Sequence, residues 1–533
     1  MYNIESYQEP FWAKSGNFVR GRDPLGVQNS SISVYATLLP GLTNLTLRLR
    51  YYGFYLWLLD EYLVQDKKLR NIKSDELEAH YTYIRRAELI LAFVMAKTNP
   101  EELSVIGSNY VADHKEDAAK EGFYDIEHGA DKEYQSEEHK VYWDYTSGAL
   151  GQYYAGSLIG LGLVEQRKGR FRRTDDKGTV LANAFRNSVD VEDRKLFLDR
   201  VVEGKLYEED IKRLSKFALN TSVEKKEEGQ YYFEMLLRPD SDKIKTYTGE
   251  ISHQRKESIQ LFLNKLKESK DKNAWQQLPV LLYLDNLSVN RNDVSEASFG
   301  WYFYQLNEFT HYYLETIFWG LLKEMDSKEY ALQHFLKHIS SNSIQVCSEL
   351  FRIDSDQSAS KWMSSIELDT LENVSLIGGN VKSNEISEGI ARGICGLLSL
   401  YKENEQKIED LKYYAYNHQV HEKHGNALEV FQNYISSNLD LPLEQFIRKV
   451  VHTLMNEHIS IAYYKMGNGE KNLLKFLIED NYLVHIETMN PNFTNPRLKT
   501  LFNFMVDLRV IDKDGNILER GEELLSELNK SNV

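Results

Sequence analysis

Hydrophobic and polar positions follow a helical period over most of this chain. Spacing of the 3.6-residue type predicts six amphipathic helices in its middle part. They cover residues 208–219, 252–267, 275–284, 299–323, 328–338 and 383–414. No segment there alternates clearly enough to predict a strand. The pattern indicates a mainly α fold with a helical middle domain at residues 191–440.

The N-terminal part predicts two further helices with different surroundings. Residues 45–64 carry apolar side chains on most faces, including Phe54 and Trp57, which is typical of a buried helix. The next helix runs from Ser74, a good N-cap, to about Lys97. We expect these helices to form an N-terminal helical domain at residues 1–135.

A first winged-helix-like module is predicted at residues 136–190. Residues 142–162 indicate a helix or a helix pair that ends at Gly162. A hairpin follows over residues 167–174 with a glycine at its tip, and Asp175 then caps the next helix. This order of helix, hairpin and helix resembles the winged-helix fold.

The C-terminal segment, residues 441–533, repeats this order. Residues 470–480 predict a helix, residues 482–487 either a short strand or a helix, and Pro496 opens a helix that ends at Leu508. Residues 510–518 form a predicted hairpin with an Asp-Gly turn, and residues 519–528 a closing helix. We therefore expect a multi-domain helical protein with two winged-helix-like modules and small β-hairpin wings.

Composition agrees with compact domains and indicates a compartment. The chain has 533 residues, 42% hydrophobic and 27% charged, which predicts two to four domains. Its two cysteines, Cys347 and Cys395, are too few for a disulfide framework and form no CxxC pair. No signal pattern and no run of about 18 apolar residues is present. We expect a cytoplasmic protein without a membrane span.

One predicted hairpin is basic, although the chain as a whole is acidic. A net charge of −16 excludes non-specific coating of nucleic acid, so phosphate contacts need a local basic patch. The first wing has five such cations, each able to meet one phosphate. They are Arg167, Lys168, Arg170, Arg172 and Arg173. These residues are the predicted nucleic-acid-binding site; the alternative is a solvated hairpin that pairs with acidic helices of the same chain.

The second wing differs in charge. Asp512 and Asp514 flank Lys513, so this wing is a poor reader of DNA. Winged-helix folds also dock proteins, and fold does not fix function. We predict a partner-binding site here that comprises Arg497, Lys499, Asp512 and Lys513.

Catalytic patterns are missing from the sequence. There is no Walker motif, no GxSxG elbow and no Glu-x-Lys pattern of restriction-type nucleases. One histidine group lacks the HxxxH spacing that suits a metal: His418, His421 and His424. A second group, His452 and His458 with Glu457, offers a general base without further support. We expect no catalytic residue, no metal and no cofactor.

Two arginines, Arg48 and Arg50, lie next to the buried aromatic helix. They are two residues apart and so do not share a helix face. Buried arginines are normally paired, which favours internal salt bridges over a ligand site. The same interpretation applies to the loop with Arg20, Arg22 and Asp23.

Three N-terminal motifs carry a resemblance to a known group. They are GRDPLG at residues 21–26, LLPGLTN at 38–44 and RLRYYGFY at 48–55. This pattern resembles bacterial proteins of anti-phage defence loci, a group from which no catalytic residue is carried over. The C-terminal module is more loosely similar to kleisin-type subunits, which join the two heads of an SMC ATPase through terminal winged helices. The continuous helical middle departs from kleisins, whose middles are often extended.

The resemblance and the residues together suggest a function. We expect a non-enzymatic DNA-binding adaptor subunit of a bacterial anti-phage defence complex, in the manner of a kleisin with an SMC-type ATPase or with another defence subunit. The first wing would touch DNA and the second would dock the partner; a homodimer is left open. The alternatives are a stand-alone effector nuclease with an unfamiliar site and a winged-helix transcription regulator, which predicts a dimer and an operator.

Overall fold

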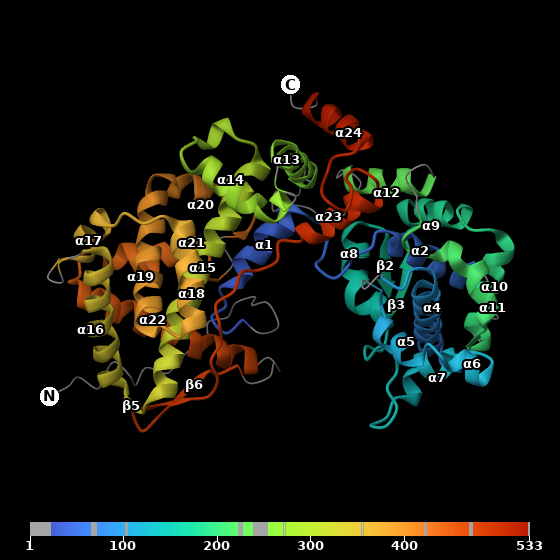
Figure 1. Ribbon diagram of the computed structural model, residues 1–533, viewed down its shortest axis with the longest axis horizontal. Helices are drawn as coiled ribbons and strands as arrows, with labels where there is room; N and C mark the ends of the chain where they lie inside the picture. The colour runs from blue at the N-terminus through green and yellow to red at the C-terminus, as the bar shows by residue number, and fades with distance from the viewer. Residues whose placement is uncertain are drawn as a thin grey trace. The chain divides into compact units, whose positions relative to one another are not determined.

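The computed structural model describes residues 23–64, 72–101, 105–221, 227–237, 254–269, 271, 273–352, 354, 357–420, 424–467 and 473–530. Over these ranges helices dominate, with three small antiparallel sheets of two or three strands (Figure 1). The predicted mainly α, multi-domain fold is therefore confirmed. By its contacts the chain forms two compact units, each built from two stretches: unit 1 comprises Met1–Tyr35 and Pro279–Thr494, and unit 2 comprises Ala36–Leu278 and Asn495–Val533.

Unit 1 is built around one long helix, α15 (Glu296–Ser327), whose side chains are nearly all buried. A helix that is apolar on most faces belongs in a core. Helix α19 (Ile386–Asn404) packs along α15 (Figure 1). Gly396 permits this approach, because a Cβ there would lie 2.5 Å from the ring of Tyr313.

Further helices surround this pair. Helix α16 (Leu332–Phe351) contacts α19 and α22 (Leu443–Gly467), and α18 (Thr370–Ser383) contacts α19. The described residues of unit 1 also form α17 (Ala359–Ser365), η7 (Arg291–Asp293), η8 (Glu405–Lys407), α20 (Ile408–Asn417), α21 (Ala427–Val430), η10 (Phe431–Ile435) and η11 (Ser436–Asn438). Helices α1 (Gln28–Leu38) and α14 (Leu278–Leu287) each run across a unit boundary. Within the described residues, no helix is both long and apolar enough to cross a membrane.

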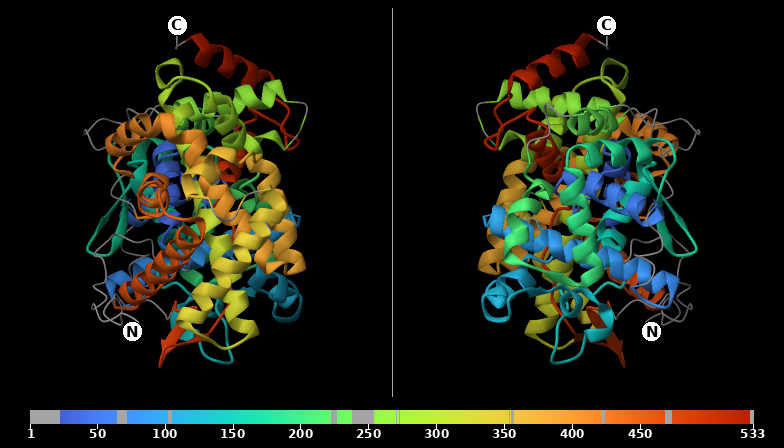
Figure 2. Two further views of the ribbon diagram at one scale, coloured as in Figure 1. Left: turned by 90° about the vertical axis from the view of Figure 1, so that its left-hand side faces the viewer. Right: turned by 90° about the vertical axis from the view of Figure 1, so that its right-hand side faces the viewer.

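A three-stranded antiparallel sheet lies at the C-terminal end of α15 (Figure 2). Its order is β5 (Tyr330–Ala331), β7 (Tyr482–His485) and β6 (Phe476–Glu479). The helix predicted at 470–480 is therefore wrong for its described part. The physical reason is the turn, since Asp480 and Asn481 both adopt positive φ, the geometry of a two-residue hairpin. The strand alternative for residues 482–487 is confirmed for residues 482–485.

Unit 2 has an aromatic core. Helix α2 (Arg50–Val64) packs on α9 (Lys177–Asn187), so the prediction of a buried helix is confirmed, although it begins only at Arg50. Trp57 is fully buried and its ring lies 5.2 Å from that of Phe217. Helix α4 (Glu76–Thr98) is also largely buried, and its N-cap is Asp75 rather than the predicted Ser74.

Other elements of unit 2 are short. Its helices include α5 (Ser108–His114), α6 (Asp117–Glu121), α7 (Ile126–Ala130), η2 (Lys132–Tyr134), α10 (Val191–Glu203), α11 (Glu208–Leu214), η4 (Ser215–Phe217), α12 (Glu227–Leu237), α13 (Gln254–Glu268) and η6 (Ala274–Gln277). Strands β1 (Tyr124–Asp125) and β4 (Lys205–Leu206) pair with each other.

The predicted middle helices are present with shifted ends. The predicted helix 299–323 is the inner part of α15, and the predicted helix 328–338 begins with β5 and continues as the longer α16. The predicted helix 383–414 is divided into α19 and α20 by a 3₁₀ turn. Periodicity thus located the helices, while their ends follow local caps and turns.

The first predicted hairpin is confirmed in unit 2. The π-helix η3 (Leu150–Tyr154) and helix α8 (Ala155–Gly160) precede Gly162, whose φ of +72° suits a helix end. Strands β2 (Val164–Arg167) and β3 (Arg170–Arg173) pair antiparallel around a tip of Lys168 and Gly169. We call residues 164–173 the basic hairpin. The next helix, α9, has Asp176 as its N-cap rather than the predicted Asp175.

The C-terminal helices α23 (Leu498–Asp507) and α24 (Glu519–Lys530) confirm two predictions. The predicted hairpin between them is a tight turn closed by one bridge, Ile511 to Ile517, rather than a strand ladder. The unit boundaries fall after residues 35, 278 and 494, so the predicted segments 1–135, 136–190, 191–440 and 441–533 are not the compact units. In particular, segment 441–533 is divided, with α22, β6 and β7 in unit 1 and α23 and α24 in unit 2.

Candidate nucleic-acid interface

The base of the basic hairpin is fixed by an ion pair. Arg173 donates from Nε to Oδ1 of Asp60 at 2.6 Å and from Nη1 to Oδ1 of Asp175 at 2.7 Å. Asp60 lies on α2, is buried, and also pairs with Arg186. Arg173 is therefore an anchor between the hairpin and the core, and its guanidinium is occupied.

Two other arginines of the basic hairpin also meet carboxylates. Arg170 pairs with Glu76 at the start of α4. Arg167 places Nε 2.9 Å from Oε1 of Glu165 on its own strand, and its side chain stays 64% exposed. The alternative raised from the sequence, pairing with acidic helices of the same chain, thus describes Arg170 and Arg173.

Lys168 and Arg172 differ from these three arginines. Lys168 is exposed at the tip with a φ of +49°. Arg172 is half-buried and lies opposite Glu165 in the strand register. Neither has an ion pair with a carboxylate in the part of the chain that the structure describes. Together with exposed Arg167, they are the positive groups that the basic hairpin offers to a ligand.

Helix α4 holds the basic hairpin along its length. The hydroxyl of Tyr81 donates to the carbonyl of Gly169 at 2.8 Å, and the N–H of Phe171 donates to Nε2 of His80 at 3.2 Å. Burial and the nearby Arg170 charge lower the pKa of His80 to about 3. His80 is therefore neutral at pH 7 and able to accept that bond. These two hydrogen bonds fix the basic hairpin against α4.

The predicted partner-binding residues have mixed surroundings. Arg497 donates from Nη1 to the carbonyl of Leu39 at 3.1 Å. Oδ1 of Asp512 accepts the backbone N–H groups of Asp514 and Asn516, both at 2.9 Å, and so shapes its own turn. Lys499 and Lys513 are exposed. Two members of the set thus have structural contacts, and the two lysines are accessible.

Internal salt bridges at Arg48 and Arg50 are confirmed. Arg48 places Nη2 3.1 Å from Oδ1 of Asp507, and Arg50 places Nε 3.2 Å from Oε1 of Glu228. The second pair is almost fully buried. Arg20 and Arg22 lie outside the described residues, so their predicted pairing stays a prediction.

The described members of the first histidine group do not converge on one point. His418 lies 2.7 Å from Oε1 of Glu296 through Nε2. His424 lies 3.4 Å from Glu429 and 3.5 Å from Glu457. His421 lies outside the described residues. These contacts are with separate carboxylates and are typical of ion-pair and hydrogen-bond packing.

His458 uses both ring nitrogens. Its Nδ1 lies 3.0 Å from the carbonyl of Pro24, and its Nε2 accepts the N–H of Lys475 at 3.0 Å. Burial lowers the pKa of His458 to about 4, so the ring is neutral. It joins three segments of unit 1 and has no nitrogen left for a general base. His452 contacts Asn456 instead.

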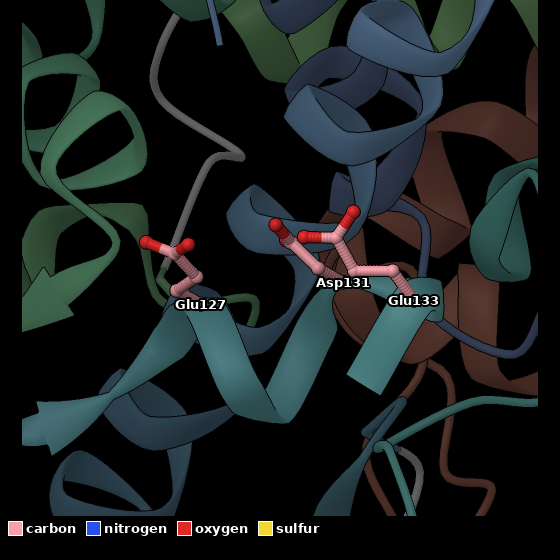
Figure 3. A group of neighbouring side chains, drawn as sticks. All are labelled: Glu127, Asp131 and Glu133. Atoms are coloured by element: carbon pink, nitrogen blue, oxygen red, sulfur yellow. The ribbon is translucent and has the colours of Figure 1, made fainter. Parts of the chain in front are cut away.

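One acidic group was not found from the sequence. The carboxylates of Glu127, Asp131 and Glu133 lie within 4.8 Å of one another, on α7, η2 and the link between them (Figure 3). Arg86 binds both oxygens of Asp131, at 2.8 and 2.7 Å, and Lys73 lies 2.6 Å from Glu133. These two cations offset most of the negative charge. The group is therefore an ion-pair network, and acidic residues in a charged loop give no sequence signal for it.

Comparison with protein-family models, curated proteins and solved structures found no match to this chain. The resemblances to defence proteins and to kleisins stay predictions.

Proposed function

We propose that this protein is a non-enzymatic adaptor subunit that contacts nucleic-acid phosphates through the basic hairpin. One observation supports it above the others. Arg170 and Arg173 tie the hairpin to α4 and α2, while Lys168 and Arg172 have no ion pair with a described carboxylate. A rigid ridge presents these cations at a low entropic cost of binding.

The proposed contact is with the phosphate backbone. Lysine and arginine on phosphates provide affinity and salt dependence, and sequence choice needs contacts to base edges. Three cations, Arg167, Lys168 and Arg172, predict a slope of log K against log salt of about −2 to −3. On a chain with a net charge of −16, such binding is weak by itself. Stable association with DNA then needs a partner.

The partner we propose is an ATPase or another subunit of a bacterial anti-phage defence complex. The basis is the resemblance of the N-terminal motifs, together with the lack of a catalytic motif in the sequence. Lys499 and Lys513 are exposed and are the proposed contacts. The proposed compartment is the cytoplasm, in keeping with two buried cysteines in the thiol form.

A salt-resolved binding assay tests the nucleic-acid part. Fluorescence anisotropy with duplex DNA and duplex RNA is measured at about 50 and 200 mM salt. We expect Lys168→Ala with Arg172→Ala to weaken binding about tenfold or more and to flatten the salt slope. The matched control is Lys195→Ala with Lys212→Ala, which removes the same charge from exposed positions of unit 2. Equal affinity of the hairpin variant and the wild type contradicts the proposal.

Purification of the native protein tests the partner. A co-purifying ATPase or nuclease is expected, and its loss with Lys499→Glu and Lys513→Glu supports the docking site. Recovery of the chain alone contradicts the adaptor role. Cleavage of DNA or RNA by the purified chain with a divalent ion favours the nuclease alternative.

A further inference from the structure

A polar pocket of about 240 Å³ lies within unit 2. Its walls are formed by residues 48–50 at the start of α2, the residue after α4, the loop after η4, and the end of α23 with the segment after it. Residues from the two sequence stretches of this unit meet there. Those with polar side chains include Arg48, Arg50, Asn99, Asn220, Arg509 and Lys513.

The lining of this pocket carries an excess of positive charge. Four of its residues are arginine or lysine, and Asp507 is its single carboxylate. Both oxygens of Asp507 are engaged, since Oδ1 lies 3.1 Å from Nη2 of Arg48 and Oδ2 accepts the N–H of Leu49 at 3.0 Å. Arg50 is balanced from the inside by Glu228. The charges of Arg509 and Lys513 therefore remain.

Two arginines make the floor of the pocket rigid. Arg50 donates from Nη1 to the carbonyls of Lys216 and Ala218, at 2.7 and 2.6 Å. Arg48 donates from Nη2 to the carbonyl of Leu219 at 3.4 Å. The loop that brings Asn220 to the pocket is thus held before any ligand arrives, which lowers the entropic cost of binding.

The outer cations come from the segment after α23. Arg509 has a φ of +57° and donates its N–H to the carbonyl of Val506 at 3.0 Å. A positive φ is uncommon for a residue other than glycine. Arg509 and Lys513 are both exposed, and neither has a carboxylate partner among the described residues. The backbone turn places both cations at one pocket.

We infer that this pocket binds a phosphate group, as a phosphate monoester, with Arg509 and Lys513 as its charged ligands. Arginine suits a phosphate because its planar fork donates two parallel hydrogen bonds. The side-chain amides of Asn99 and Asn220 add neutral donors at the wall. The volume lies below the roughly 300–1,000 Å³ of pockets for larger ligands and fits one compact anionic group.

This site is separate from the basic hairpin, and phosphate binding there does not depend on the proposed nucleic-acid contact. It shares Lys513 with the proposed partner contacts. The same chemistry has two sources, the terminal phosphate of a nucleic-acid strand and a small phosphorylated molecule such as a nucleoside monophosphate. Both present a dianionic group with three terminal oxygens, unlike the phosphodiesters inside a strand.

Titration calorimetry with the full chain tests the inference. The probes are inorganic phosphate, a nucleoside monophosphate, a 5′-phosphorylated oligonucleotide and the same oligonucleotide with a 5′-hydroxyl. We expect Arg509→Ala with Lys513→Ala to weaken phosphate binding at least about tenfold, because charge-assisted contacts are lost. The control Lys195→Ala with Lys212→Ala removes equal charge and is expected to bind as the wild type does.

The arms of the experiment separate the two sources. A preference for the 5′-phosphorylated strand over the hydroxyl strand, lost in the Arg509/Lys513 variant, identifies a strand end as the ligand. Binding of the monophosphate with no gain from the strand identifies a small ligand. Retained phosphate binding by the hairpin variant, Lys168→Ala with Arg172→Ala, keeps this result distinct from the proposed function. No binding of any phosphate probe to the wild type, or equal binding by the Arg509/Lys513 variant, overturns the inference. Thermal unfolding of each variant checks its fold.

Discussion

Oε2 of Glu315, on the buried α15, accepts the backbone N–H of Asn492 at 2.8 Å. About two turns earlier on the same helix, Oε2 of Glu308 accepts the N–H of Thr494 at 2.7 Å. His311 lies between them, and its Nε2 is 3.1 Å from the carbonyl of Asn492. A row of buried ionisable groups therefore holds the last residues of unit 1.

This row predicts a stability that falls as pH rises. Burial, the largest influence, raises the pKa of Glu315 from 4.5 to about 7, against the opposing effect of His311. The unfolded chain then releases its proton at lower pH than the folded chain. The contribution is complete below about pH 4.5 and is lost as pH rises through 7, with a size up to about 3 kcal/mol. Urea unfolding of wild type and Glu315→Gln at pH 5 and 8 should show a smaller pH effect in the variant. An equal change in unfolding free energy between pH 5 and pH 8 in the wild type and the variant contradicts the prediction.

His80 predicts the opposite sign in unit 2. Its folded pKa of about 3 lies below the ordinary 6.5, mainly because of burial. The contribution of neutral His80 to the free energy of unfolding is therefore complete above pH 6.5. It is lost as pH falls, by up to about 3 kcal/mol at pH 4.5. His80→Gln removes the charging step, so its unfolding free energy should change less between pH 7 and 4.5. The same variant keeps an acceptor near the N–H of Phe171, and a large loss at pH 7 would argue against this account.

Of the two carboxylates that pair with Arg173, Asp60 is predicted to contribute more to the free energy of unfolding than Asp175. Asp60→Ala leaves Arg173 and Arg186 without this buried partner, and such losses cost about 3–5 kcal/mol. Asp175 pairs with the same arginine but is fully exposed, so Asp175→Ala should lower the free energy of unfolding far less than Asp60→Ala does. Denaturant unfolding measures both. Equal effects of the two substitutions contradict the assignment of Asp60 as the anchor.

The two thiols are predicted to be unreactive in the folded state. Sγ of Cys347 lies 3.8 Å from Sγ of Cys395, and both side chains are buried. Burial raises the pKa of the Cys395 thiol well above its usual value, which disfavours the reactive thiolate. An aromatic disulfide reagent should react with neither cysteine in buffer and with both in denaturant. Rapid modification of the folded protein contradicts this expectation.

Local pattern predicted the helices and the first hairpin because those elements depend on neighbouring residues. The apolar stretch of α15 and the glycine at the hairpin tip are visible in the sequence. Strand β6 was missed because four residues carry little periodic signal. The third strand of its sheet, β5, pairs with β7 and lies far back in the chain.

The candidate sites depend on distant contacts and were therefore harder to predict. Charge alone indicated the basic hairpin, but the partner of Arg173 is 113 residues earlier. The phosphate pocket brings Arg48 from near the start of the chain to Lys513 near its end. Both members were noted in the sequence for other reasons, yet nothing in their local spacing indicates that they share a wall.

The composition of unit 2 from two separate stretches has a consequence for synthesis. Asp507 accepts the N–H of Leu49, and the ring of Phe502 stacks on Trp275 at 4.8 Å. A nascent chain on the ribosome has made residues 36–278 long before α23 is translated. Residues 36–278 therefore remain incompletely packed while residues 279–494 of unit 1 are translated. Loss of residues 495–533 would therefore damage a domain whose other stretch begins at residue 36.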